Sequence, residues 1–332
     1  AVYGNNHYEI YYNIDQSLPK DIPSAEANEK LKSKFDMSNV HIMMLKSGLS
    51  GKEKSELDKK IEEVDGVKWV LGIDSLVGAN MPEEMIPQDI KDMLSTDNYD
   101  LQFIGSDYGS ATDEANAQLA DINKIVKSYQ KEGMVIGEAP LMKDLQDVTD
   151  VDLKMVNIVS IAAIFVIIML TFKSISIPVI LVAVIEFAIA CNMAVPYYMQ
   201  DSLAFVASIV IGTIQLGATV DYAILMTNRY HKERTIREKS KREAIRIAHE
   251  TSIKSIMISG FCFFAATFGV AAYSRVDMIG SICMLLARGA VISMVVVICL
   301  LPAFLWIFDG VIKHTSLDMI KAKVAQRDKE AH

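Results

Sequence analysis

The sequence predicts two unlike parts, an α-helical membrane bundle of five transmembrane helices and, before it, an α+β domain outside the membrane. The chain has 332 residues, of which 51% are apolar although 22% are charged. These two classes are separated along the sequence. Residues 1–154 hold 16 lysines, no arginine and 29 acidic residues, whereas the remainder holds 17 basic and 12 acidic residues. An acidic soluble domain is therefore followed by a basic, very apolar one.

Five apolar runs decide what the second part is. Each is at least about 18 residues long and, at about 1.5 Å per residue, reaches the roughly 30 Å of a bilayer core. A soluble core of five such helices would need more polar surface than residues 151–310 offer. The sequence therefore predicts transmembrane helices over residues 155–172, 177–196, 203–226, 256–273 and 281–308.

Basic residues gather in two places, which indicates the orientation in the membrane. Residues 229–254 carry nine lysines and arginines, and the tail over residues 311–332 carries five. Because cytoplasmic segments are enriched in these residues, we expect both inside and the domain over residues 1–150 outside the cell. We expect the basic segment over residues 229–250 to form an amphipathic helix on the cytoplasmic leaflet, where membrane lipids, and not nucleic acid, are its partner.

Strands and helices alternate in the outside domain, in the order strand, helix, strand, short helix, strand, helix, strand. They are expected at residues 41–45, 53–64, 67–73, 87–94, 99–104, 114–129 and 133–137. This order is typical of a split βαβ, ferredoxin-like unit. The domain has no cysteine, which excludes a disulfide framework.

No chemistry of catalysis or cofactor binding is recognisable in this domain. Gly51 and Lys52 are followed by Glu53, where a phosphate loop needs Ser or Thr. The six histidines of the chain are scattered and form no pair at metal-ligand spacing. We therefore expect no enzyme, no catalytic residues, no metal and no bound cofactor.

The third apolar run contains an ionisable side chain, Asp221. It lies about 27 Å from the outer end of this run, in the inner part of the bilayer. A carboxylate there costs at least ~2.5 kcal/mol unless it faces protein or trapped water, and protonation removes that cost. Asp221 is therefore a candidate proton-relay residue. The alternative is a structural Asp paired with a neighbouring helix.

The helical period divides the residues around Asp221 into two faces that both avoid lipid. One face is small and polar, with Ser208, Gly212, Gln215, Thr219 and Tyr222, and the next has Ile214, Gly217, Asp221 and Leu225. Gly212 and Gly217 permit the close approach of other helices. Tyr222 offers a hydroxyl that could relay or hold the proton. The third run is therefore predicted to be a central helix.

Two further ionisable residues lie in other apolar runs. Glu186, at the centre of the second run, is a candidate for a second protonation site or a substrate contact, or it pairs with a polar group elsewhere in the protein. Arg288 lies in the last run, at the outer boundary of its uninterrupted apolar part over residues 289–308, and we expect its long side chain to reach the membrane interface.

Residues 215–230, QLGATVDYAILMTNRY, resemble the fourth-helix signature of the MMPL (mycobacterial-membrane-protein-large) branch of the resistance-nodulation-division (RND) superfamily. The resemblance extends over nearly the whole chain, through IGEAPL at 136–141, TSIKSIMISG at 251–260, ARGAVIS at 287–293 and LLPAFLWIFD at 300–309. Members typically have twelve helices in two similar halves, each with one helix, an external porter domain and five helices. The chain resembles a C-terminal half without its first helix.

The resemblance implies proton-motive-force-driven export of a lipid or another hydrophobic or amphiphilic compound across a bacterial cell membrane. Asp221 and Tyr222 would be the proton relay of this half, with H⁺ as the coupling ion. The implied partners are a hydrophobic substrate and the companion N-terminal half, or a second copy in a homo-oligomer. Two alternatives are a SecDF-like protein-translocation auxiliary and a sterol-sensing-like scaffold that binds lipid without transport. The sequence DYAIL at residues 221–225 favours the exporter.

Overall fold

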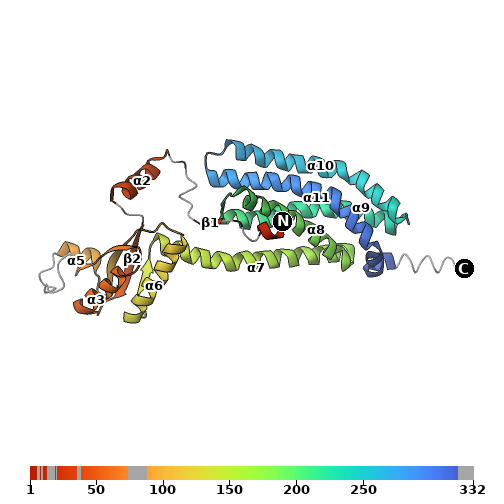
Figure 1. The fold of residues 1–332 in the computed structure, drawn as a ribbon. Coiled ribbons are helices and arrows are strands. Elements are labelled where there is room, and N and C mark those ends of the chain that lie inside the picture. The colour runs from red at the N-terminus through yellow and green to blue at the C-terminus, as the bar shows by residue number, and fades with distance from the viewer. Residues whose placement is uncertain are drawn as a thin grey trace. The chain divides into compact units, whose positions relative to one another are not determined.

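The computed structural model describes residues 1–5, 8, 10–12, 19, 21–35, 39–73 and 88–320 (Figure 1). Their contacts divide the chain into two units. Tyr12–Asp150 forms an α+β unit, and Ala1–Tyr11 belongs with the part from Val151 onward in a helical unit.

An antiparallel sheet forms the centre of the α+β unit, with the strand order β3-β4-β2-β5. The strands are β2 (Asn39–Lys46), β3 (Val67–Leu71), β4 (Tyr99–Ser106) and β5 (Met134–Ile136). Side chains alternate along β2, where His41, Met43 and Leu45 are buried and the residues between them are partly exposed. This is the period of a strand with one covered face.

Two helices, α3 (Gly51–Glu62) and α6 (Asp113–Tyr129), cover the buried face of the sheet. A capping box begins α3, because the Ser50 hydroxyl accepts from the Glu53 amide while the Glu53 carboxylate accepts from the Ser50 amide at 2.9 Å. The apolar stripes of both helices join one core with the sheet. That core includes Leu57, Ile61, Leu119, Ile122 and Val126.

The strands and helices expected in this unit are all present, with their described ends shifted by no more than two residues. The short helix is α5 (Gln88–Leu94), and Pro87, where it was expected to begin, lies outside the described residues. A further helix, α2 (Pro23–Phe35), precedes the sheet and was not predicted.

Five long helices form the helical unit, and each is long and apolar enough to cross a membrane. They are α7 (Glu138–Phe172), α8 (Ser176–Met199), α9 (Phe205–Thr235), α10 (Lys241–Tyr273) and α11 (Asp277–Thr315). They confirm the prediction of five long apolar helices. Figure 1 shows α10 and α11 running side by side.

The helices extend beyond their apolar runs. Because α9 continues to Thr235 and α10 begins at Lys241, the basic segment over residues 229–250 is divided between two long helices. The prediction of a separate amphipathic helix over these residues is therefore wrong. Long basic side chains at the end of a membrane helix can reach water without leaving that helix. The Ser240 hydroxyl also favours the beginning of a new helix at Lys241, because it caps α10 by accepting a hydrogen bond from the Glu243 amide.

The described residues before Tyr12, assigned from the sequence to the outside domain, pack in the helical unit. The strand β1 (Ile10–Tyr11) pairs in parallel with β6 (Leu203–Ala204). The Tyr8 hydroxyl donates to Ser208 Oγ at 3.0 Å. Gly4 in α1 (Val2–Asn5) lies against α8, where an added Cβ would be 3.1 Å from that of Ala194.

His41 is a fully buried ionisable side chain of the α+β unit. Its Nε2 lies 3.4 Å from Gln118 Oε1, and its Nδ1 has no hydrogen-bond partner in the described part of the chain. Burial lowers the pKa of His41 from its ordinary value of 6.5 and outweighs the opposing contact with Gln118.

We expect the α+β unit to lose stability as the pH falls below 6.5. There the unfolded chain binds a proton at His41 that the folded unit takes up only at lower pH, so the free energy of unfolding decreases. Trp69 fluorescence in a Trp306→Phe background would report the unfolding temperature. The His41→Gln variant should show a smaller decrease than the parent, and equal decreases in the two proteins would contradict this assignment.

Candidate functional site

One face of α9 is held against α8 and α11 by buried polar side chains. Gln215 is the centre of this cluster, because its Oε1 accepts from Asn192 Nδ2 of α8 at 2.8 Å and its Nε2 donates to Ser293 Oγ of α11 at 3.1 Å. Thr219, one turn along α9, has its Oγ1 2.8 Å from the same Ser293 hydroxyl. All four side chains are buried. Such a mutually hydrogen-bonded cluster specifies one packing of the three helices.

Arg288 extends this cluster. Its Nε donates to Asn192 Oδ1 at 2.9 Å, and its Nη2 donates to the Asn192 carbonyl at 3.2 Å. Arg288 thus pairs with α8, a contact that the sequence did not predict; its reach to the membrane interface stays a prediction. Asn192 provides two acceptors on the facing helix, and a guanidinium removed from water needs such acceptors.

A second buried cluster joins the C-terminal end of α9 to α11. The Nε and Nη2 atoms of Arg234 donate to the two carboxylate oxygens of Asp309, both at 2.9 Å, and the Tyr230 hydroxyl donates to the same carboxylate. The Arg234 and Asp309 side chains are only 11% and 10% exposed. Sequence analysis missed this cluster. Its one signal is the spacing of Tyr230 and Arg234, which places both on one face of a helix.

These contacts leave another side of α9 uncovered. Gln215, Thr219 and Tyr222 are buried, whereas Gly217 and Asp221 are exposed. The two faces predicted from the helical period are thus distinct. The described residues cover the first face, and on the second face they leave Gly217 and Asp221 exposed while Leu225 packs against the core. Asp221 forms no hydrogen bond or ion pair with any residue that the structure describes.

Tyr222 is buried whereas Asp221 is exposed, although the two side chains are close enough to interact electrostatically. The Tyr222 hydroxyl interacts with Ser259 of α10. Adjacent residues of a helix point about 100° apart, so the two candidate relay residues lie on different faces, and no hydrogen bond joins them in the described structure. The carboxylate faces outward from the bundle, and the hydroxyl faces α10.

The two glycines of the predicted relay differ in their surroundings. A Cβ on Gly212 would lie 3.1 Å from Asn157 Oδ1, so Gly212 lies where a side chain of α7 approaches α9. A Cβ on Gly217 would meet nothing within 4 Å. The surface around Gly217 and Asp221 therefore has room for a closely packed helix from outside this chain.

Glu186 lies in a polar cavity of about 170 Å³ that does not include Asp221. The cavity is lined by Tyr8, Leu153, Asn157, Ile161, Glu186, Ile189, Met193, Ser208, Gly212 and Leu216. Its size and polar groups suit bound water. The structure thus separates the two predicted protonation sites.

The comparisons with known proteins agree with this architecture. The sequence model of the MMPL family matches residues 16–313. The protein YdgH from Bacillus subtilis (strain 168) is 23% identical over 292 residues, a region that covers 87% of this chain and 32% of YdgH. The chain belongs to the MMPL family and is a membrane protein with five helices suited to span the bilayer. It spans about a third of the length of YdgH.

We expect Gly289→Ala to destabilise the helical unit. An added Cβ would lie 2.8 Å from Asn192 Nδ2 and 2.9 Å from Gln215 Oε1, so their hydrogen bond must move. Gly310→Ala is the matched control on α11, because its Cβ meets nothing within 4 Å and alanine favours a helix by about 1 kcal/mol. Thermal unfolding in detergent, followed by circular dichroism, should give the lower midpoint for Gly289→Ala. Equal midpoints would contradict the claim that the hydrogen bonds of Gln215 stabilise the helical unit.

Asp309→Asn should destabilise the same unit by about 3–5 kcal/mol, since it leaves the Arg234 guanidinium buried without its counter-charge. The control is Asp318→Asn, which removes a partly exposed carboxylate 3.8 Å from Lys173 and should cost about 0–1 kcal/mol. Unfolding midpoints of the two purified variants give the comparison. If both variants match the parent, the buried cluster does not hold α9 to α11.

Proposed function

We propose that the chain is one half of a proton-driven exporter of a lipid or another hydrophobic compound. The observation that carries the proposal is the position of Asp221, a carboxylate on a membrane-spanning helix that the described residues leave exposed and unpaired. A charged carboxylate against acyl chains is costly. The charged form of Asp221 therefore requires contact with water or with a second protein surface. Proton binding removes the charge and with it this requirement.

The partner that suits this face is the companion half of the transporter, or a second copy of the chain. The open space beside Gly217 permits close helix approach, and Ile214, which is 43% exposed, adds apolar contact area on the same side. Small residues beside a polar group are typical of helix interfaces in membranes. A proton on Asp221 would then change the packing between the two halves.

The buried clusters give α9 the means to share such a change. The Gln215 cluster links α9 to α8 and α11, and the Asp309 cluster links it again to α11. Tyr222 contributes the contact with Ser259 of α10. A shift of α9 on protonation is therefore expected to move several helices together. Glu186, in its polar cavity, is the candidate for a second protonation or substrate site.

We further propose that the α+β unit is a ferredoxin-like porter domain outside a bacterial cell membrane. Its support is the strand order β3-β4-β2-β5, with α3 and α6 as the connecting helices, which is the order of a split βαβ unit. The basic residues around the turn between α9 and α10 support a cytoplasmic location for that turn. The function needs no catalytic residue, metal or bound cofactor, with H⁺ as the coupling ion.

The test is Asp221→Asn in the full-length protein, reconstituted in vesicles with an imposed pH gradient and a fluorescent amphiphile. We expect loss of gradient-driven amphiphile movement with normal folding, because Asp221 has no partner in the described chain. Asp318→Asn, a carboxylate outside the membrane-spanning helices, should transport like the parent. Coupled transport that survives Asp221→Asn would refute the relay. If no amphiphile moves in the parent under any gradient, a lipid-binding scaffold or a polypeptide substrate is favoured instead.

A further inference from the structure

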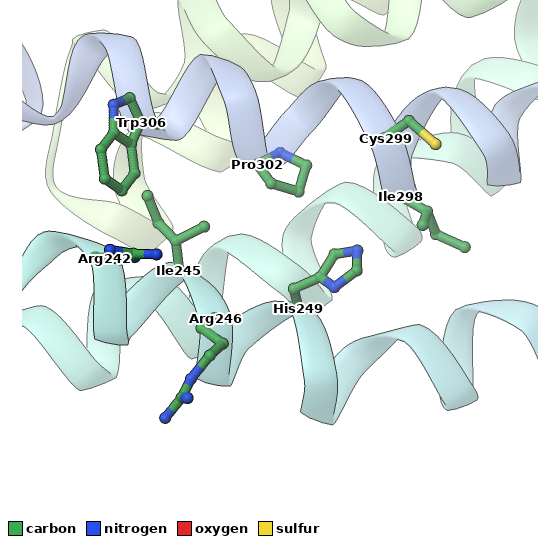
Figure 2. A pocket seen from close by; sticks show the side chains of 8 residues that line it. All are labelled: Arg242, Ile245, Arg246, His249, Ile298, Cys299, Pro302 and Trp306. Atoms are coloured by element: carbon green, nitrogen blue, oxygen red, sulfur yellow. The ribbon is translucent and has the colours of Figure 1, made fainter.

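An open groove of about 630 Å³ lies between the beginning of α10 and the later part of α11 (Figure 2). It is separate from the Asp221 face and from the Glu186 cavity. The α10 side contributes Arg242, Ile245, Arg246 and His249, and the α11 side contributes Ile298, Cys299, Pro302 and Trp306. Positions 242, 245, 246 and 249 follow the helical period, so they form one stripe along α10.

The polar side of the groove is basic. No Asp or Glu lines it, and Arg242 forms no ion pair with any residue that the structure describes. Arg246 has only a long contact with Glu250, 3.9 Å between two side chains that are more than 60% exposed, which contributes little. Glu243, the nearest acid along α10, is paired with Lys239 at 2.9 Å. Among the described residues, Arg242 therefore lacks a counter-charge, and Arg246 has only this weak one.

The other side of the groove is apolar and aromatic. The ammonium of Lys241 lies over the Trp306 ring, 4.7 Å from its centroid. Figure 2 shows Arg242 on α10, across the groove from Trp306 on α11. Aromatic and basic side chains together are typical of the level of the lipid headgroups. From Trp306 the wall continues along α11 through Pro302 to Ile298, about 12 Å along the helix axis. Cations thus lie beside Trp306, and apolar surface extends away from them.

We propose that this groove binds one anionic phospholipid of the cytoplasmic leaflet. The phosphate lies at Arg242 and Arg246, and an acyl chain follows the surface of Pro302, Cys299 and Ile298. The charge complementarity and the position at the end of two membrane-spanning helices support this occupant, since basic pockets between such helices on the cytoplasmic side bind anionic headgroups. The proposal is independent of transport, because it uses neither Asp221 nor Glu186.

Trp306 provides a direct probe of this groove. The chain has two tryptophans, so Trp69→Phe leaves Trp306 as the only one. The protein is reconstituted in vesicles of unbrominated phosphatidylcholine. One series contains increasing fractions of brominated phosphatidylglycerol, and the other contains increasing fractions of brominated phosphatidylcholine. Brominated acyl chains quench a tryptophan in contact with them. We expect brominated phosphatidylglycerol to quench Trp306 more strongly at equal mole fraction, with each cation contributing about fivefold to its relative affinity.

The variant Arg242→Gln/Arg246→Gln should lose this preference and be quenched equally by both lipids. The matched control, Arg229→Gln/Lys232→Gln, removes the same charge from exposed positions of α9 that do not line the groove, and it should keep the preference. Equal helix content by circular dichroism establishes that both variants fold. Three results would overturn the proposal: an equal loss in both variants, no preference in the parent, or quenching by neither lipid, which would mean that protein covers the groove.

Discussion

The hydrogen bonds of Gln215 fix which way α9 faces, and the exposure of Asp221 follows from them. Gln215 contacts Asn192 of α8 and Ser293 of α11 within one buried cluster. Because a helix cannot turn one residue without turning its neighbours, this contact directs the face with Gly217 and Asp221 away from the bundle. Rotating α9 would leave these buried polar groups without hydrogen-bond partners, which costs free energy. The network therefore determines the rotation of α9 about its axis.

The second cluster gives the same helix a rigid end. Asp309 accepts from Arg234 and Tyr230 where α9 approaches its C-terminus, so α9 is attached to α11 at two places along its length. Between these attachments lies Asp221, with no partner in the described chain. This arrangement supports the proposal that protonation of Asp221 controls the contact of α9 with a second protein surface.

The helical period was enough to predict the two faces of α9, and the length of the apolar runs was enough to locate the five membrane helices. Both depend only on the sequence within one element. The strands of the sheet and the helices α3, α5 and α6 were predictable for the same reason, whereas α2 was not predicted. The pairing of Arg288 with Asn192 and of Arg234 with Asp309 was not, since it depends on how two helices are registered against each other. The division of residues 229–250 between α9 and α10 was missed because basic side chains were assigned to a surface helix when they instead extend membrane helices.

In the full-length protein we expect protein, and not lipid, to cover the Asp221 face. Spin labels attached at Gly217→Cys and Leu170→Cys in the full-length protein without its native cysteines test it through their collision rates with oxygen, which concentrates among lipid chains. Leu170 is 68% exposed on α7 and serves as the lipid-facing reference. We predict a much lower collision rate at position 217 than at position 170. Equally high rates at both positions would contradict the claim.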